Sequence, residues 1–171
     1  MKKKSPSRKI ATLGILSAQA LVLSVLEGFI PALPYLPPGT KPGLSNIVTM
    51  FAAAEIGLPS ALTVTFIKSL FALITRGFTA FCMSLAGGLL STFIMWALFR
   101  LKSKPFGLAG IGMLSAIGHN LGQVLMASVL TSTVSIVSAL PFLAIFSVIT
   151  GYLTGTILKL LLPVLNKINN I

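Results

Sequence analysis

A short polar run, Gly118-His119-Asn120-Leu121-Gly122-Gln123, interrupts a long apolar stretch of the sequence. If this stretch is helical, His119 and Gln123 are four residues apart on one face, and Asn120 lies beside them. Hydrogen-bonding groups on one turn of an apolar helix need partners, which are either neighbouring helices or a bound ligand. We favour a ligand over purely structural hydrogen bonding, because other polar residues are expected at the same depth. Metal binding is disfavoured, since the chain has no second histidine to complete a site.

Three further polar residues lie in apolar stretches elsewhere in the chain: Glu27, Asn46 and Lys68. An ionisable side chain at the centre of a bilayer costs about 3 kcal/mol, so it usually faces a cavity or a partner. Lys68 can pair with Glu27 or contact an anionic group of a ligand. Asn46 can cap the start of a helix or face the cavity. The candidate substrate-binding residues are therefore Glu27, Asn46, Lys68, His119, Asn120 and Gln123.

The residue types that are scarce in this chain exclude several kinds of chemistry. There is no aspartate, and the only carboxylates are Glu27 and Glu55, with one histidine and a single cysteine, Cys82. Paired-carboxylate hydrolysis, carboxylate-bound Mg²⁺ and aspartate-containing triads therefore lack their parts. The chain also has no phosphate-binding loop of the Gly-x-x-x-x-Gly-Lys-Ser/Thr type, so it cannot bind ATP in that way. We expect a protein that is not an enzyme and holds no cofactor or catalytic metal.

The composition indicates that these side chains are carried by helices in a membrane. Of 171 residues, 55% are hydrophobic and 9% are charged, and the mean hydropathy is +0.99. Soluble domains carry roughly 25% charged residues, so a soluble globular fold is excluded. A membrane-spanning helix needs about 20 apolar residues, which allows five or six spans. We predict an all-α integral membrane protein, a bundle of about six transmembrane helices. The expected helices are 9–29, 44–56, 59–75, 78–99, 107–131 and 136–162, of which the second is short for a span.

The segments between and around these helices complete the predicted layout. Closely spaced prolines in residues 31–43 remove backbone donors and exclude a regular helix, so this segment is expected to be a structured outer loop over the mouth of the bundle. Residues 1–9 are a basic N-terminus, 10–165 form a single transmembrane domain, and 166–171 are a C-terminal tail. Most basic residues fall on the side of the two termini, which the positive-inside rule makes cytoplasmic. The net charge of +11 is therefore attributed to membrane topology and not to nucleic-acid binding.

Small residues recur at four-residue spacing along the predicted helices. The pairs are Gly14 with Ala18, Ser84 with Gly88, Gly118 with Gly122, and Gly151 with Gly155. Such spacing lets two membrane helices approach closely. Most of these pairs are expected to pack within the bundle. The pair in the first helix is a candidate docking surface for an external partner.

Several motifs resemble a bacterial family of small membrane proteins. They are the runs Leu26-Glu27 to Ile30-Pro31, Leu33-Pro34, Pro37-Pro38-Gly39-Thr40-Lys41, Gly43-Leu44-Ser45-Asn46-Ile47-Val48-Thr49, Ser84-Leu85-Ala86-Gly87-Gly88-Leu89-Leu90-Ser91 and Gly118-His119-Asn120-Leu121-Gly122-Gln123. The family carries two names, heptaprenyl diphosphate synthase component I and Gx transporter family. One position departs from its pattern, because Lys68 stands where arginine is expected and offers a point charge in place of a bidentate contact.

The resemblance implies two different functions. The family is similar to the substrate-binding S components of energy-coupling-factor (ECF) transporters, six-helix proteins that bind a vitamin or metal from outside. There, a transmembrane coupling protein and two ATPases form a separate module, and small residues of the first helix dock onto it. Gly14 and Ala18 are the matching positions here. Prenyl diphosphate synthases, in contrast, hold Mg²⁺-diphosphate with aspartate-rich motifs that this chain lacks.

We therefore expect an S component of an ECF-type importer for a small polar or anionic molecule, in the bacterial cytoplasmic membrane. The alternative is a non-catalytic accessory subunit of heptaprenyl diphosphate synthase, whose partner would be a soluble prenyl diphosphate synthase subunit. A purely structural membrane scaffold is a third possibility. The sequence does not name the substrate, but one acid, one base, one histidine and three amides suit a zwitterionic or anionic molecule better than a hydrocarbon.

Overall fold

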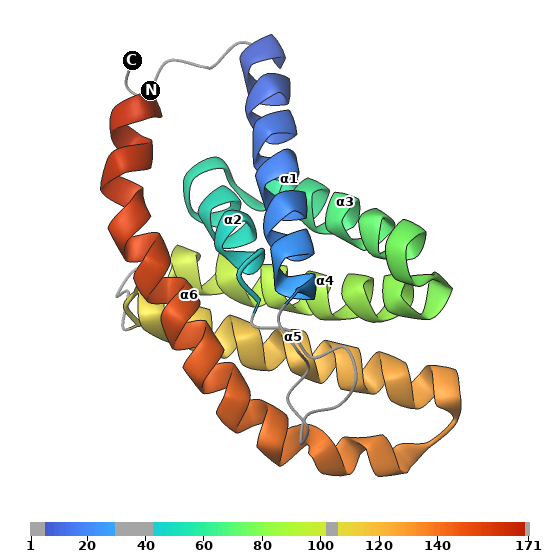
Figure 1. Ribbon diagram of the computed structural model, residues 1–171. Helices are drawn as coiled ribbons and strands as arrows, with labels where there is room; N and C mark the ends of the chain where they lie inside the picture. Colours follow the sequence, from blue (N-terminus) through green and yellow to red (C-terminus); the bar gives the residue numbers. More distant parts are fainter. Residues whose placement is uncertain (1–5, 30–42, 102–105, 170–171) are drawn as a thin grey trace.

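The computed structural model describes residues 6–29, 43–101 and 106–169, and every regular element within these ranges is helical (Figure 1). The predicted all-α fold is thus confirmed. The elements are α1 (Pro6–Gly28), α2 (Asn46–Phe51), the π-helical turn η1 (Ala52–Ile56), α3 (Leu58–Arg76), α4 (Phe78–Arg100), α5 (Leu108–Thr131), the 3₁₀ turn η2 (Val134–Ala139) and α6 (Leu140–Asn169). Most of the proline-rich segment predicted as an outer loop lies outside the described residues.

Five helices are long and apolar enough to cross a membrane: α1, α3, α4, α5 and α6. The sixth predicted helix, expected to be short, consists of the six residues of α2 and the five of η1. At 1.5 Å per residue this pair is about 16 Å long, roughly half of the 30 Å hydrocarbon core. The helix 46–56 therefore adds a sixth apolar helix to the fold, but it is too short to cross the bilayer by itself.

The two terminal helices extend further than the hydropathy pattern predicts. α1 begins at Pro6, although 9–29 was expected, and α6 continues to Asn169, beyond the expected end at 162. Lysine and arginine are good helix formers, so a helix need not stop where the apolar residues do. The segment 166–169, expected as part of a C-terminal tail, is therefore the last turn of α6.

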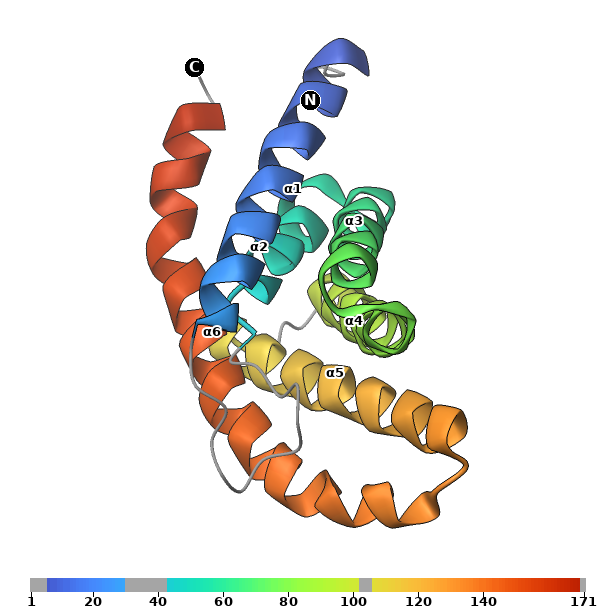
Figure 2. The ribbon, with the colours of Figure 1, turned by 45° about the vertical axis from the view of Figure 1, so that its right-hand side comes forward.

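Helices α3, α4 and α5 lie side by side, and α6 runs along α5 before it passes α2 (Figure 1). α1 packs against α2 and α3 and crosses the direction of α3 at a steep angle, as Figures 1 and 2 both show. The start of α1 and the end of α6 lie at the same side of the molecule. The placement of both termini on one side of the membrane stays a prediction.

Glycines allow the close contact between α4, α5 and α6. A Cβ atom added to Gly122 would lie 2.8 Å from Cα of Gly87, and one added to Gly151 would lie 2.5 Å from Cα of Met113. Any side chain at these positions would force the helices apart. The expected packing of these small-residue pairs is thus confirmed. Gly14 differs, because nothing lies within 4 Å of a Cβ atom added there.

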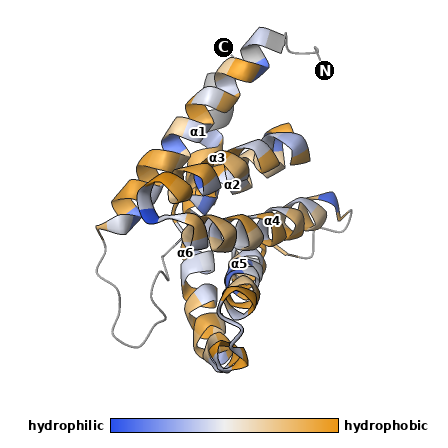
Figure 3. Cartoon of the chain, turned by 90° about the vertical axis from the view of Figure 1, so that its right-hand side faces the viewer, coloured by the Kyte–Doolittle hydropathy of each residue, from blue (hydrophilic) through white to orange (hydrophobic). Residues whose placement is uncertain are grey.

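The outer surface is apolar, and many buried side chains are polar. Figure 3 shows hydrophobic residues along the outside of most helices, and Ile10, Ile74 and Ile145 are each more than half exposed. Inside, Thr65 of α3 and Thr92 of α4 are buried and share a hydrogen bond of 2.8 Å. An apolar outer surface with polar side chains inside is typical of a protein that faces lipid, where interhelical hydrogen bonds replace contacts with water.

Candidate ligand site

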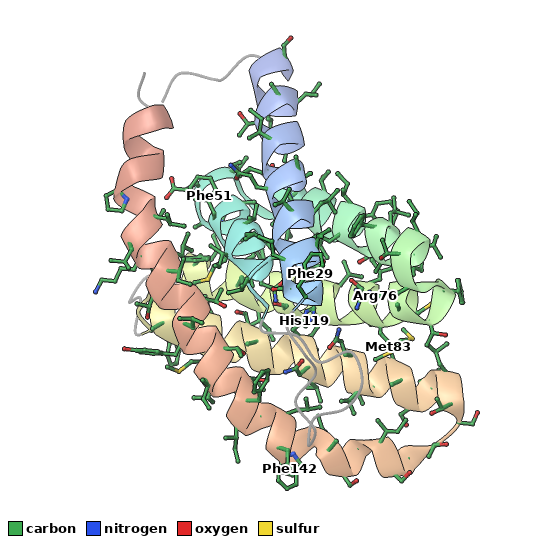
Figure 4. All side chains as sticks on the ribbon, viewed as in Figure 1. Phe29, Phe51, Arg76, Met83, His119 and Phe142 are labelled. Carbon is green, nitrogen blue, oxygen red and sulfur yellow. The ribbon has the colours of Figure 1, made fainter. Side chains whose placement is uncertain are left out.

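A polar cavity of about 50 Å³ lies where α1, α2, α3, α4 and α5 meet. It is lined by Ser24 and Glu27 of α1, Gly43, Ser45 and Asn46 at the start of α2, Lys68 and Arg76 of α3, Ser84 of α4, and His119 and Gln123 of α5. Five of the six predicted substrate-binding residues are in this set. Figure 4 shows two of the lining residues, His119 on α5 and Arg76 at the end of α3. The structure therefore brings together side chains from helices that are far apart in the sequence.

Glu27 connects the end of α1 to the start of α2. Its side chain is 3% exposed, and its carboxylate accepts hydrogen bonds from the backbone N–H of Ser45 (2.9 Å) and from the Ser45 hydroxyl (3.4 Å). The N–H groups that begin a helix have no partner within it, so a carboxylate there satisfies one of them and interacts favourably with the helix dipole. Glu27 thus stabilises the junction of two helices as well as lining the cavity.

Lys68 contacts Asn46, not Glu27. The Lys68 ammonium donates a 2.7 Å hydrogen bond to Oδ1 of Asn46, and the residues that the structure describes contain no ion pair between Lys68 and Glu27. The N-cap residue of α2 is Ser45 and not Asn46, whose side chain lines the cavity. A lysine ammonium has three protons, and only one is used here. Two N–H groups of Lys68 remain for another acceptor.

His119 and Gln123 face the cavity together, as their spacing predicts. Gly87 of α4 makes this possible, because a Cβ atom there would lie 2.7 Å from Cγ of Gln123 and 3.3 Å from Cε1 of His119. The Nδ1 atom of the His119 ring is buried with no partner among the described residues. An unpaired buried polar atom costs about 1–3 kcal/mol, so this nitrogen requires a water molecule or a ligand.

Asn120 points toward α6. Its amide donates a 2.7 Å hydrogen bond to the hydroxyl of Ser147, and both side chains are buried. This contact is the interhelical hydrogen bonding that the sequence left as the alternative to ligand binding. Asn120 also lines a second cavity of about 10 Å³, together with Asn46 and His119. That volume corresponds to about one water molecule.

Arg76 lines the polar cavity and was not among the site residues predicted from the sequence. It is the last residue of α3, and Gly77, with φ of +87°, turns the chain directly after it. The spacing could have indicated this position, because Arg76 lies about two helical turns beyond Lys68 and so within the same broad face of α3. The serines at positions 24, 45 and 84 also line the cavity and were not singled out, since single serines are common in membrane helices.

The two candidate docking residues, Gly14 and Ala18, are both exposed on α1. Ala18 lines an apolar groove of about 730 Å³ between α1, α2 and α6, with Val22 and Ile157 among its walls. The groove and the polar cavity have no lining residue in common. The predicted docking residues and the predicted ligand residues therefore belong to two separate surfaces.

The comparison with protein families identifies the chain. The family model described as heptaprenyl diphosphate synthase component I matches residues 16–161. This chain belongs to that family. The matched region contains every residue of the polar cavity and most of the apolar groove. The family name describes one component of a synthase and so implies a partner subunit. The chain matched none of the curated proteins and none of the solved structures with which it was compared.

Proposed function

We propose that this member of the family is the substrate-binding S component of an ECF-type importer for a small polar or anionic molecule. The observation that carries the proposal is the convergence of Glu27, Asn46, Lys68, His119 and Gln123 on one cavity. Charged groups within membrane helices usually mark a ligand or ion pathway, because burying them without a function destabilises the protein. Of the six predicted site residues, Asn120 is assigned to the adjoining small cavity and to helix packing.

The topology supports entry of the ligand from outside. The cavity is lined by the C-terminal parts of α1 and α3, the start of α2, the N-terminal part of α4 and the second half of α5. In the six-helix layout predicted from the sequence, these parts lie on the side opposite the N-terminus. The positive-inside rule makes the termini cytoplasmic, so the cavity belongs to the outer half of the membrane.

The groove beside α1 supports docking of a membrane partner. Gly14 and Ala18 are small, exposed residues four apart on α1, and nothing lies within 4 Å of a Cβ atom at Gly14. Such a face lets another helix approach closely. The partner in this proposal is the transmembrane coupling protein of an ECF module. Because this chain has no phosphate-binding loop, ATP hydrolysis is the task of the two ATPase subunits.

A second candidate function follows from the family name, which describes a component of heptaprenyl diphosphate synthase. In that case the chain is a non-catalytic membrane subunit, since it contains no aspartate to hold Mg²⁺-diphosphate. Its partner is then a soluble prenyl diphosphate synthase subunit. Both candidates place the protein in the bacterial cytoplasmic membrane and neither makes it an enzyme by itself.

Affinity purification of the tagged protein from its native host in mild detergent separates the two functions. Mass spectrometry of the proteins that co-purify should detect a coupling protein and two ATPases. The double variant Gly14→Leu/Ala18→Leu should lose these partners, whereas Thr79→Leu, which enlarges an exposed residue on α4, should retain them. Recovery of a prenyl diphosphate synthase in place of the ATPases would refute the transport proposal and support the accessory role.

A further inference from the structure

Three charged side chains line the polar cavity, and their sum is positive. Lys68 and Arg76 are cations and Glu27 is the single acid. An excess positive charge attracts a ligand group of the opposite sign. The cavity therefore favours an anion over a cation of the same size.

Among the described residues, the cavity also has more unpaired hydrogen-bond donors than unpaired acceptors. Both carboxylate oxygens of Glu27 accept hydrogen bonds from Ser45, and Oδ1 of Asn46 accepts one from Lys68. On the donor side, Lys68 has two N–H groups left. Arg76, which has five, makes no hydrogen bond or ion pair within the described part of the chain. Lys68 and Arg76 together keep N–H donors without partners among the described residues, so the cavity can bind an acceptor such as an oxyanion, and the unpaired Nδ1 atom of His119 is left for a water molecule or a donor group.

A third cavity shares two lining residues with the polar cavity. It has a volume of about 220 Å³ and is lined by residues of α1 and α3: Ser24, Val25, Gly28, Phe71, Thr75 and Arg76. Ser24 and Arg76 line both cavities. Arg76 therefore lies at the junction of a charged cavity and a less polar one between α1 and α3.

We infer that the ligand is an amphipathic organic anion, with a carboxylate or phosphate group bound by Lys68 and Arg76 and a less polar body in the cavity between α1 and α3. This inference rests on the proposed ligand site and adds the class of ligand. An arginine fork contacts two oxygens of such a group at once, whereas lysine supplies a point charge. Glu27 is engaged with Ser45 and serves to position α2, so a second, cationic group on the ligand is not required.

Binding to the full-length protein in lipid nanodiscs, measured by isothermal titration calorimetry, tests this class. Four probes are compared: butyl phosphate, pentanoate, inorganic phosphate and butyltrimethylammonium. At least one of the two butyl anions should bind, and more tightly than inorganic phosphate, which lacks the apolar body. The relative affinities of butyl phosphate and pentanoate distinguish a phosphate site from a carboxylate site. Butyltrimethylammonium, with a similar chain and the opposite charge, should not bind.

Variants of Arg76 test whether the anion binds at the proposed site. Because Arg76 is exposed, its substitution should not disturb the core. Arg76→Gln should weaken binding of the anion by about tenfold or more, and Arg76→Lys should weaken it less, because the charge is kept. Arg100→Gln is the matched control, since Arg100 is also exposed at the end of a helix, where it stacks on Trp96 at 5.5 Å from the ring centre. Its affinity should equal that of the unmodified protein.

Two sets of results would overturn the inference. The assigned ligand class would be contradicted if neither anion binds, or if the cation binds as tightly as the anions. If Arg76→Gln binds the anion as tightly as the unmodified protein does, the anion is not bound by Arg76. The transport proposal is judged separately by the partners that co-purify. If ATPases are recovered and anions fail to bind, the ligand class is wrong and the transport proposal stands. If anions bind through Arg76 and no ATPase is recovered, the ligand class stands and the transport proposal is wrong.

Discussion

Nζ of Lys68 lies 2.7 Å from Oδ1 of Asn46, so the amide at the start of α2 holds a lysine in the middle of α3. Asn46 directly follows Ser45, which binds Glu27 through its backbone and its hydroxyl. Two opposite charges are thereby connected through adjacent residues of α2 and not by a direct contact. Such an arrangement keeps the ammonium available to a ligand, which a tight ion pair would not do.

Substitution of Asn46 tests this contact. Asn46→Ala leaves a partly buried Lys68 ammonium without its acceptor and should lower the free energy of unfolding by about 1–3 kcal/mol. Asn46→Asp keeps an oxygen at the same place and should retain most of the stability. It also cancels the positive excess of the cavity, so anion binding should fall. Thermal unfolding and calorimetry of both variants measure these effects. Equal stability of Asn46→Ala and the unmodified protein would refute the structural role of this hydrogen bond.

Substitution of Glu27 tests the junction between α1 and α2. Glu27→Ala removes the acceptor of the buried Ser45 N–H and should destabilise the protein by about 1.5–3 kcal/mol, as expected for a hydrogen bond to a charged group. Glu27→Gln keeps one acceptor oxygen and should be less harmful. Glu55 is the matched control, because it is the other glutamate and is exposed. Glu55→Ala should change stability by less than about 0.5 kcal/mol. Thermal unfolding of the three variants ranks them, and a loss in Glu55→Ala as large as in Glu27→Ala would contradict this assignment.

Gly87→Ala should damage both the packing of α4 on α5 and the cavity. The added methyl group would lie 2.6 Å from the backbone oxygen of His119 and 2.7 Å from Cγ of Gln123, so the helices must shift. Overpacking of this kind typically costs about 1–3 kcal/mol, and ligand binding should weaken together with stability. Gly14→Ala meets nothing within 4 Å and should leave the stability of the isolated protein unchanged or raise it by up to about 1 kcal/mol. Similar unfolding temperatures for the two variants would be inconsistent with the described helix contact.

The neighbouring residues Asn120 and His119 should respond differently to substitution. Asn120→Ala breaks the hydrogen bond to Ser147 between α5 and α6 and should lower stability by about 0.5–2 kcal/mol. A double-mutant cycle with Ser147→Ala should show coupling between the two positions. His119→Ala removes a cavity-lining ring whose Nδ1 atom has no partner within the described residues, so it should reduce ligand binding more than stability. If Asn120→Ala abolishes binding without loss of stability, Asn120 belongs with the ligand and not with the helix contact.

The helical fold and half of the cavity residues could be predicted from the sequence, for an energetic reason. A backbone in hydrocarbon must satisfy its own hydrogen bonds, so apolar runs of sufficient length become helices. Glu27, Lys68 and His119 stand out within such runs, because a polar side chain in an apolar environment requires a compensating contact. Length alone also predicted that the helix 46–56 would be short, and it is.

The rotation of each helix against its neighbours was decided only by the tertiary structure. Spacing placed Asn120 beside the face shared by His119 and Gln123, but the packing of α5 between α4 and α6 turns His119 toward the cavity and Asn120 toward Ser147. The same packing brings Arg76 into the cavity and joins Lys68 to Asn46. These contacts depend on the distances between helices. Glycines such as Gly87 and Gly122 set these distances, because they let neighbouring helices approach closely. A linear pattern assigns a residue to a face of its own helix, whereas its partner depends on how all the helices pack together.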